Sequence, residues 1–136
     1  MAKLGDLAHI GVYVSNTHRS VQFYTNVLGF ERFSECELEE NGNPVKLAFL
    51  RNGNLILELI EFAKPIHRGD GIVDHFAITS EDIETICENL KSKGIVFETK
   101  EIGYAANVLE NGCKGIFFRG PDNERIEIVE PVSKIS

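Results

Sequence analysis

The feature that most constrains the fold of this 136-residue chain is an internal repeat. Residues 7–62 and 72–131 each predict the order strand, helix, strand, strand, strand. We therefore expect an α+β protein of two tandem βαβββ modules, joined by a linker at residues 63–71 into a single domain over 1–136. The matched landmarks are His9 and His75, Gly29 and Gly94, and the triplets Leu57-Glu58-Leu59 and Ile126-Glu127-Ile128.

Local signals predict the elements of each half. A helix is expected over residues 19–28, because apolar side chains recur at helical spacing between a capping Asn16 or Thr17 and a stop at Gly29. The matching helix of the second half covers residues 83–93. The strand pairing is left open. Strands are expected at residues 8–15, 30–38, 45–51, 55–61, 72–79, 95–99, 114–119 and 124–130, with a short irregular strand within 100–113.

Composition argues against several classes of protein. The net charge of −7 disfavours a surface for nucleic acid or anionic lipid, which needs clustered lysine and arginine. No apolar run approaches the roughly 20 residues that span a bilayer. The N-terminal residues lack the pattern of a signal peptide, so a cytoplasmic location is expected. An odd number of cysteines argues against a disulfide framework, and reduced thiols are predicted for Cys36, Cys87 and Cys113.

Glu58 occupies an unusual place, inside the apolar strand N-L-I-L-E-L-I-E-F at residues 54–62. A carboxylate there either faces water or is held by a group that offsets its desolvation, which costs several kcal/mol when the charge is unpaired. Because side chains alternate across a strand, Glu58 shares a face with Ile56 and Ile60. Glu127 has the same place in the last strand of the second half.

Four residues at matched positions form a set of metal-ligand type. A divalent cation bound by two imidazoles and two carboxylates would neutralise the acidic groups within their apolar strands. Zn²⁺, Ni²⁺, Co²⁺, Fe²⁺ and Mn²⁺ all accept such mixed nitrogen and oxygen ligands. Taken singly, either histidine is also consistent with a core position, and the last glutamate with an exposed strand edge. The four residues are His9, Glu58, His75 and Glu127.

Several stretches resemble the vicinal oxygen chelate superfamily, which includes glyoxalase I, methylmalonyl-CoA epimerase, extradiol dioxygenases, fosfomycin-resistance enzymes and bleomycin-binding proteins. These stretches are H-I-G-V-Y-V, S-V-Q-F-Y-T-N-V-L-G-F, L-E-L-I-E, D-H-F-A-I and G-P-D-N-E-R-I-E-I-V-E. The resemblance implies a curled mixed sheet around a metal-binding cavity. It also implies that the four residues bind one metal ion. Since the two modules of a site come from one chain or from two in this superfamily, a homodimer is expected.

Within the superfamily, the ligand set discriminates between activities. The order His-Glu-His-Glu resembles glyoxalase I. Dioxygenases and fosfomycin enzymes use two histidines and one glutamate, and epimerases commonly have Gln where Glu58 stands. Bacterial glyoxalase I typically carries an arginine and an asparagine that serve glutathione. Tyr13 and Phe62 occupy those positions in this chain, which puts dependence on glutathione in doubt.

The resemblance implies a metal-dependent lyase or isomerase that acts on a small α-oxygenated carbonyl compound, with a thiol adduct as one form of the substrate. Glu127 or Glu58 would transfer the proton, and Tyr13 and Phe62 would contact the substrate. An epimerase of the methylmalonyl-CoA type, a ring-cleaving oxygenase and a non-catalytic drug-binding protein remain as alternatives.

The other charged side chains are assigned to the surface. Glu61 is expected to face water or to pair with a lysine or arginine, and Glu130 to be exposed. For Arg119 and Arg125, surface ion pairs are favoured over contact with a substrate carboxylate. Surface positions are also predicted for His18 and His67.

Overall fold

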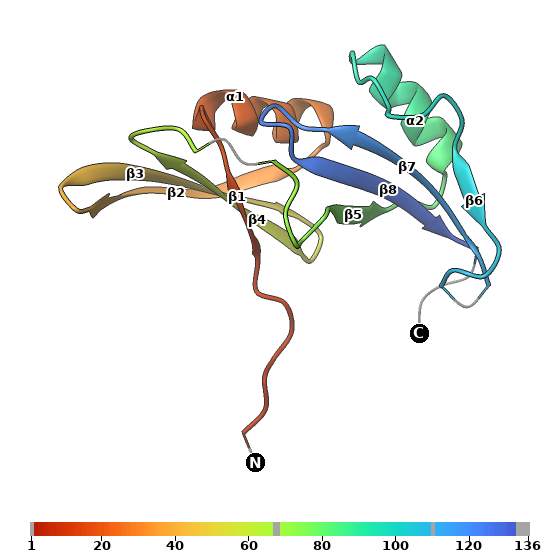
Figure 1. Ribbon diagram of the computed structural model, residues 1–136, viewed down its shortest axis with the longest axis horizontal. Helices are drawn as coiled ribbons and strands as arrows, with labels where there is room; N and C mark the ends of the chain where they lie inside the picture. The colour runs from red at the N-terminus through yellow and green to blue at the C-terminus, as the bar shows by residue number, and fades with distance from the viewer. Residues whose placement is uncertain (1, 67–68, 110, 133–136) are drawn as a thin grey trace. The chain divides into compact units, whose positions relative to one another are not determined.

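The protein divides into two compact units, Met1–His67 and Arg68–Ser136. Each unit contains one mixed four-stranded sheet together with its helical segment (Figure 1). The predicted α+β architecture of two tandem βαβββ modules is confirmed. In the part of the chain that is described, no helix is long and apolar enough to cross a bilayer. The structure, a computed structural model, describes residues 2–66, 69–109 and 111–132.

In the first unit, the strand order is β1-β4-β3-β2, with β1 parallel to β4 and the other pairs antiparallel. The predicted helix begins at Thr17, where the side chain of Asn16 accepts a hydrogen bond from the backbone N–H of Arg19 at 3.0 Å. Its second half is a π-helical turn, η1. The elements are β1 (Ile10–Tyr13), α1 (Thr17–Gln22), η1 (Phe23–Val27), β2 (Glu31–Glu40), β3 (Asn43–Asn52) and β4 (Leu55–Phe62).

The second unit repeats this topology, with the order β5-β8-β7-β6. The expected strand at 72–79 is shorter than predicted, because β5 begins only at Phe76. The short strand expected within 100–113 is present as β6. The elements are β5 (Phe76–Thr79), α2 (Ile83–Ser92), β6 (Gly103–Ala105), β7 (Cys113–Arg119) and β8 (Arg125–Pro131).

The predicted strand at residues 95–99 is wrong. The segment forms one isolated bridge, from Phe97 to Phe118, and no ladder. Its first N–H, that of Ile95, is used by the end of α2, and the hydroxyl of Thr99 bonds the carbonyl of Glu101 at 3.0 Å. The end of α2 and this bend therefore limit the contact with β7 to Phe97 and Glu98, whose N–H donates to the carbonyl of Phe117 at 2.8 Å.

The buried core of each unit consists mainly of apolar side chains of its sheet and its helical segment. Leu57 and Leu59 of β4 are completely buried, as is Tyr24 of η1. Burial of one such side chain contributes about 1.5–3 kcal/mol, so these positions determine which face of β4 lies inward. Glu58, between the two leucines, is only half-buried and points to the opposite face, which confirms the predicted alternation. All three cysteines are free, as predicted.

A glutamate on the helix-facing side of the last strand holds the helix start in both units. Glu61 of β4 accepts hydrogen bonds from the backbone N–H of Thr17 at 2.5 Å and from its hydroxyl at 2.9 Å. Glu130 of β8 accepts one from the backbone N–H of Ile83, the first residue of α2, at 2.9 Å. The first N–H groups of a helix have no partner within the helix and form its positive end, so a carboxylate stabilises them.

A lysine on the adjacent strand accompanies each of these glutamates. Lys46 lies 3.8 Å from Glu61, and Lys114 lies 3.6 Å from Glu130. The prediction that Glu61 pairs with a lysine or arginine is thus confirmed. The interpretation of Glu130 as exposed is wrong, because its partner at the helix start is distant in sequence.

We predict that Glu61→Ala and Glu130→Ala each lower the free energy of unfolding by about 1–2 kcal/mol, since each leaves a helix N–H without its acceptor. Urea denaturation measures this change. Glu39→Ala, on the exposed strand β2, is the control and is expected to stay within about 0.5 kcal/mol of the parent protein. Equal losses in all three variants would contradict the role assigned to the two glutamates.

Candidate functional site

His9 and Glu58 lie together in the first unit. His9 comes directly before β1, and its Nε2 is 3.6 Å from Oε1 of Glu58 on the parallel neighbour β4. Gly11 is the register partner of Glu58, and a Cβ there would stand 3.7 Å from the same Oε1. The side chain of Glu58 is 19% exposed, on the face of the sheet opposite the helix. The 3.7 Å separation at Gly11 is an ordinary van der Waals distance, so the Glu58 carboxylate does not require a glycine at this position.

His75 and Glu127 repeat this arrangement in the second unit. His75 comes directly before β5, and its Nε2 is 3.1 Å from Oε1 of Glu127 on β8. A Cβ at Gly115 of β7 would come within 2.7 Å of the other oxygen of Glu127, which is closer than real side chains allow. A larger residue at this position would force the carboxylate of Glu127 to move. Sequence reasoning missed Gly115, although a glycine inside a strand is a known signal of close approach.

A phenylalanine packs against the histidine in each unit. Phe49 is the register partner of Glu58 on β3, and its ring lies edge-on to His9 with centroids 6.1 Å apart. Phe117 is the partner of Glu127 on β7, and it lies edge-on to His75 at 4.9 Å. In each unit, one phenylalanine ring therefore packs beside the His–Glu pair.

The two histidines differ in the surroundings of Nδ1, their other ring nitrogen. Nδ1 of His75 lies 2.7 Å from Oδ2 of Asp74, and the same oxygen accepts a hydrogen bond from Arg125 at 2.6 Å. Among the described residues, no carboxylate contacts Nδ1 of His9. The residue before His9 is Ala8, whereas the residue before His75 is Asp74. Sequence analysis proposed both histidines as metal ligands and did not distinguish between them.

Ion pairs surround the second pair. The hydrogen bond to His75, and then that to Arg125, hold the pKa of Asp74 below its usual range. Hydrogen bonds from Arg125 and then from Arg119 lower the pKa of Glu98 in the same way. The surface ion pairs favoured for both arginines are thereby confirmed. Because these groups are open to solvent, the pairs contribute more to orientation than to stability.

Tyr13 and Phe62, the expected substrate contacts, lie against each other. Their ring centroids are 5.6 Å apart, with the planes tilted by 39°. Tyr13 pairs in register with Ile60, two residues beyond Glu58, so both rings lie on the same face as that carboxylate. The first unit thus offers an aromatic surface next to its His–Glu pair, with Tyr13 36% exposed.

Within each unit, two of the four predicted ligands lie together as a pair. His9 and Glu58 belong to one unit, and His75 and Glu127 to the other. Within residues 2–66, 69–109 and 111–132, no three His, Cys, Asp or Glu side chains form a metal-binding group.

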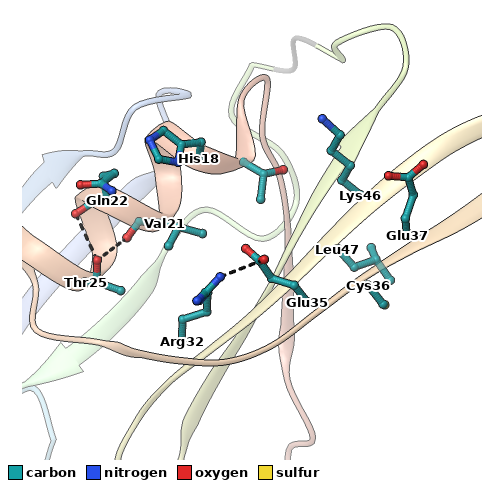
Figure 2. A pocket seen from close by; sticks show the side chains of 11 residues that line it. His18, Val21, Gln22, Thr25, Arg32, Glu35, Cys36, Glu37, Lys46 and Leu47 are labelled. Atoms are coloured by element: carbon teal, nitrogen blue, oxygen red, sulfur yellow. Dashed lines mark hydrogen bonds and ion pairs between the residues drawn. The ribbon is translucent and has the colours of Figure 1, made fainter.

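A concavity lies on the helix side of the first unit (Figure 2). It measures about 600 Å³ and is lined by α1, η1, β2 and β3. Arg32 and Glu35, two of its charged side chains, form an ion pair at 2.9 Å. None of the six predicted site residues lines it. His18 lies at its edge and is exposed, as predicted, whereas His67 lies outside the described residues.

Known proteins share this sequence and fold. Among relatives, the uncharacterized Bacillus subtilis protein YwkD is 31% identical over 131 residues, which cover 93% of this chain and 98% of that protein. A Synechocystis protein named "Probable lactoylglutathione lyase" is 26% identical over 136 residues, covering 94% and 97%. The crystal structure of a glyoxalase family protein from Enterococcus faecalis superposes with a TM-score of 0.74 at 26% identity, covering 92% and 97%.

A family model provides the assignment. The model described as Glyoxalase/Bleomycin resistance protein/Dioxygenase superfamily matches residues 6–128, which include both His–Glu pairs and all four strands of each module except the last residues of β8. The chain therefore belongs to the Glyoxalase/Bleomycin resistance protein/Dioxygenase superfamily.

Proposed function

We propose that this protein is a divalent-metal-dependent lyase or isomerase of the glyoxalase type. Its substrate would be a small α-oxygenated carbonyl compound, such as the hemithioacetal of methylglyoxal and a thiol. The observation that carries the proposal is the repeated pair of imidazole and carboxylate, 3.6 Å apart in one module and 3.1 Å in the other. The Synechocystis relative supports the choice of a lyase. A cytoplasmic location belongs to the same proposal.

The residues present fit a divalent cation. We propose that one cation is bound by His9, Glu58, His75 and Glu127, so that each module contributes one nitrogen and one carboxylate ligand. Zn²⁺, Ni²⁺, Co²⁺, Fe²⁺ and Mn²⁺ accept this donor set. In each module, Nε2 of the histidine already faces an oxygen of the glutamate, and in the second module Gly115 leaves space beside that carboxylate.

Proton transfer would be the task of a glutamate. When bound, the cation supplies a Lewis acid that polarises the carbonyl of a substrate with two neighbouring oxygens. Glu127 or Glu58 would act as a base and remove the proton from the carbon next to the carbonyl group. The same glutamate would then act as an acid and deliver this proton to the carbonyl carbon. Tyr13 and Phe62 pack against the apolar part of the substrate and orient it.

Metal analysis tests the ligand set. We expect about one transition metal ion per chain, and a sharp loss of metal in His9→Ala and in His75→Ala, because each change removes one nitrogen ligand. His18→Ala, at an exposed histidine outside both pairs, is the control and should keep its metal. Full metal content in a variant that lacks both His9 and His75 would contradict the assignment.

Assembly is a second prediction. We propose a homodimer, since the ten-residue strand β2 is an exposed sheet edge that a second chain would cover. Light scattering measures the mass. Mixing His9→Ala/Glu58→Ala chains with His75→Ala/Glu127→Ala chains then shows whether two chains share a site, because only shared sites would regain metal. A monomer with full metal content would contradict the dimer.

Substrate preference is a third prediction. Tyr13 and Phe62 provide no charged group for the carboxylates of glutathione, so activity is expected to depend little on this thiol. The measurement compares kcat/KM for the methylglyoxal hemithioacetals of glutathione and of smaller thiols. The variant Tyr13→Arg/Phe62→Asn is expected to shift the preference toward glutathione. A hundredfold preference of the parent protein for the glutathione adduct, about 2.7 kcal/mol, would contradict the prediction.

A further inference from the structure

A series of ion pairs runs across the second unit toward His75. Asp70 accepts hydrogen bonds from Arg119, the closer at 2.5 Å. Nε of Arg119 donates to Oε1 of Glu98 at 3.0 Å, and Oε2 of Glu98 accepts from Arg125 at 2.9 Å. Charges of opposite sign thus alternate from the segment before β5 to the start of β8.

The series ends on the proposed metal ligands. Arg125 donates from Nη1 to Oδ2 of Asp74 at 2.6 Å, and this oxygen lies 2.7 Å from Nδ1 of His75. Nε2 of His75 is then 3.1 Å from Glu127. The guanidinium of Arg125 also stacks over the ring of Phe117 at 3.8 Å. Arg125 is therefore held by a ring and by two carboxylates.

We propose that Asp74 and Arg125 are positioning residues for the metal ligand His75. Asp74 holds the imidazole with its proton on Nδ1, which leaves the lone pair of Nε2 free for a cation. Asp74 is 54% exposed and would rotate freely if it had no second partner. Arg125 supplies that partner and keeps Oδ2 in line with the ring. The inference rests on the metal-binding function proposed above.

The first unit serves as an internal comparison. His9 follows Ala8, its Nε2 lies farther from its glutamate, and its side chain is 43% exposed against 31% for His75. The second unit is therefore the preorganised half of the ligand set. We expect it to dominate the affinity for the cation.

Cobalt titration of the full-length, metal-stripped protein tests the proposal. Asp74→Ala is expected to raise the Kd for Co²⁺ about 10- to 100-fold. Asp74→Asn should recover most of this loss, because its amide oxygen still accepts the proton of Nδ1. Arg125→Gln should raise the Kd by a smaller factor, since Asp74 stays in place but is held less firmly.

Asp70→Ala is the matched control. Asp70 is 52% exposed, lies in the same segment and bonds an arginine as Asp74 does, but it does not contact His75. The Kd of the Asp70→Ala variant for Co²⁺ is expected to stay within about twofold of the value for the parent protein. The proposal is overturned if Asp70→Ala and Asp74→Ala lower the free energy of unfolding equally and neither changes the Kd for Co²⁺. In that case the ion pairs only stabilise the segment before β5.

A second measurement does not depend on metal. Nitrogen NMR of the metal-free protein at alkaline pH, where imidazole is neutral, reports the tautomer of each histidine. Asp74 at 2.7 Å and Glu127 at 3.1 Å compete for the His75 proton, and we expect the shorter contact to keep it on Nδ1 and Asp74→Ala to move it to Nε2. A tautomer that is unchanged by Asp74→Ala would overturn the positioning role. A parent protein that binds no Co²⁺ but shows the expected tautomer would instead contradict the proposed function and leave the positioning role supported.

Discussion

The buried leucines on the last strand of the first module determine where its chemistry lies. Leu57 and Leu59 pack under the helical segment, so strand alternation turns Glu58 to the other face. The same alternation places Glu61 on the face of the sheet that the helix covers, where it accepts a hydrogen bond from the backbone N–H of Thr17. One strand therefore orients a candidate ligand and anchors the helix, and the second module repeats both arrangements. Loss of this alternation would remove the site and the helix anchor together.

The modules repeat their backbone but not their electrostatics. Each places a histidine before its first strand, opposite a glutamate and a phenylalanine. Only the second adds an aspartate and an arginine behind the histidine. Tyr13 and Phe62 form an aromatic surface in the first module. We infer that both modules supply metal ligands, that the second module holds its histidine more firmly, and that the first module also shapes the contact with the substrate.

Features set by local chemistry could be predicted from the sequence. The face on which Glu58 lies follows from the alternation of side chains along a strand. The two βαβββ modules follow from the matched order of turns and strands in the two halves of the sequence. Features that join distant residues could not. Glu130 reaches a helix start 47 positions away, and Arg125 reaches Asp74 across 51 positions. The strand predicted at residues 95–99 fails for a local reason, because the end of α2 takes its first N–H and a bend begins at Glu98, so that only Phe97 and Glu98 reach β7.

X-ray absorption spectroscopy of the zinc-loaded protein tests the central claim most directly, because it reports the ligand atoms themselves. The account predicts a first shell of nitrogen and oxygen at about 2.0–2.2 Å, with imidazole scattering from two histidines. It also predicts that imidazole scattering disappears in a protein that lacks His9 and His75. A shell with sulfur at about 2.3 Å, or one of oxygen alone, would contradict the claim that the two His–Glu pairs bind the metal.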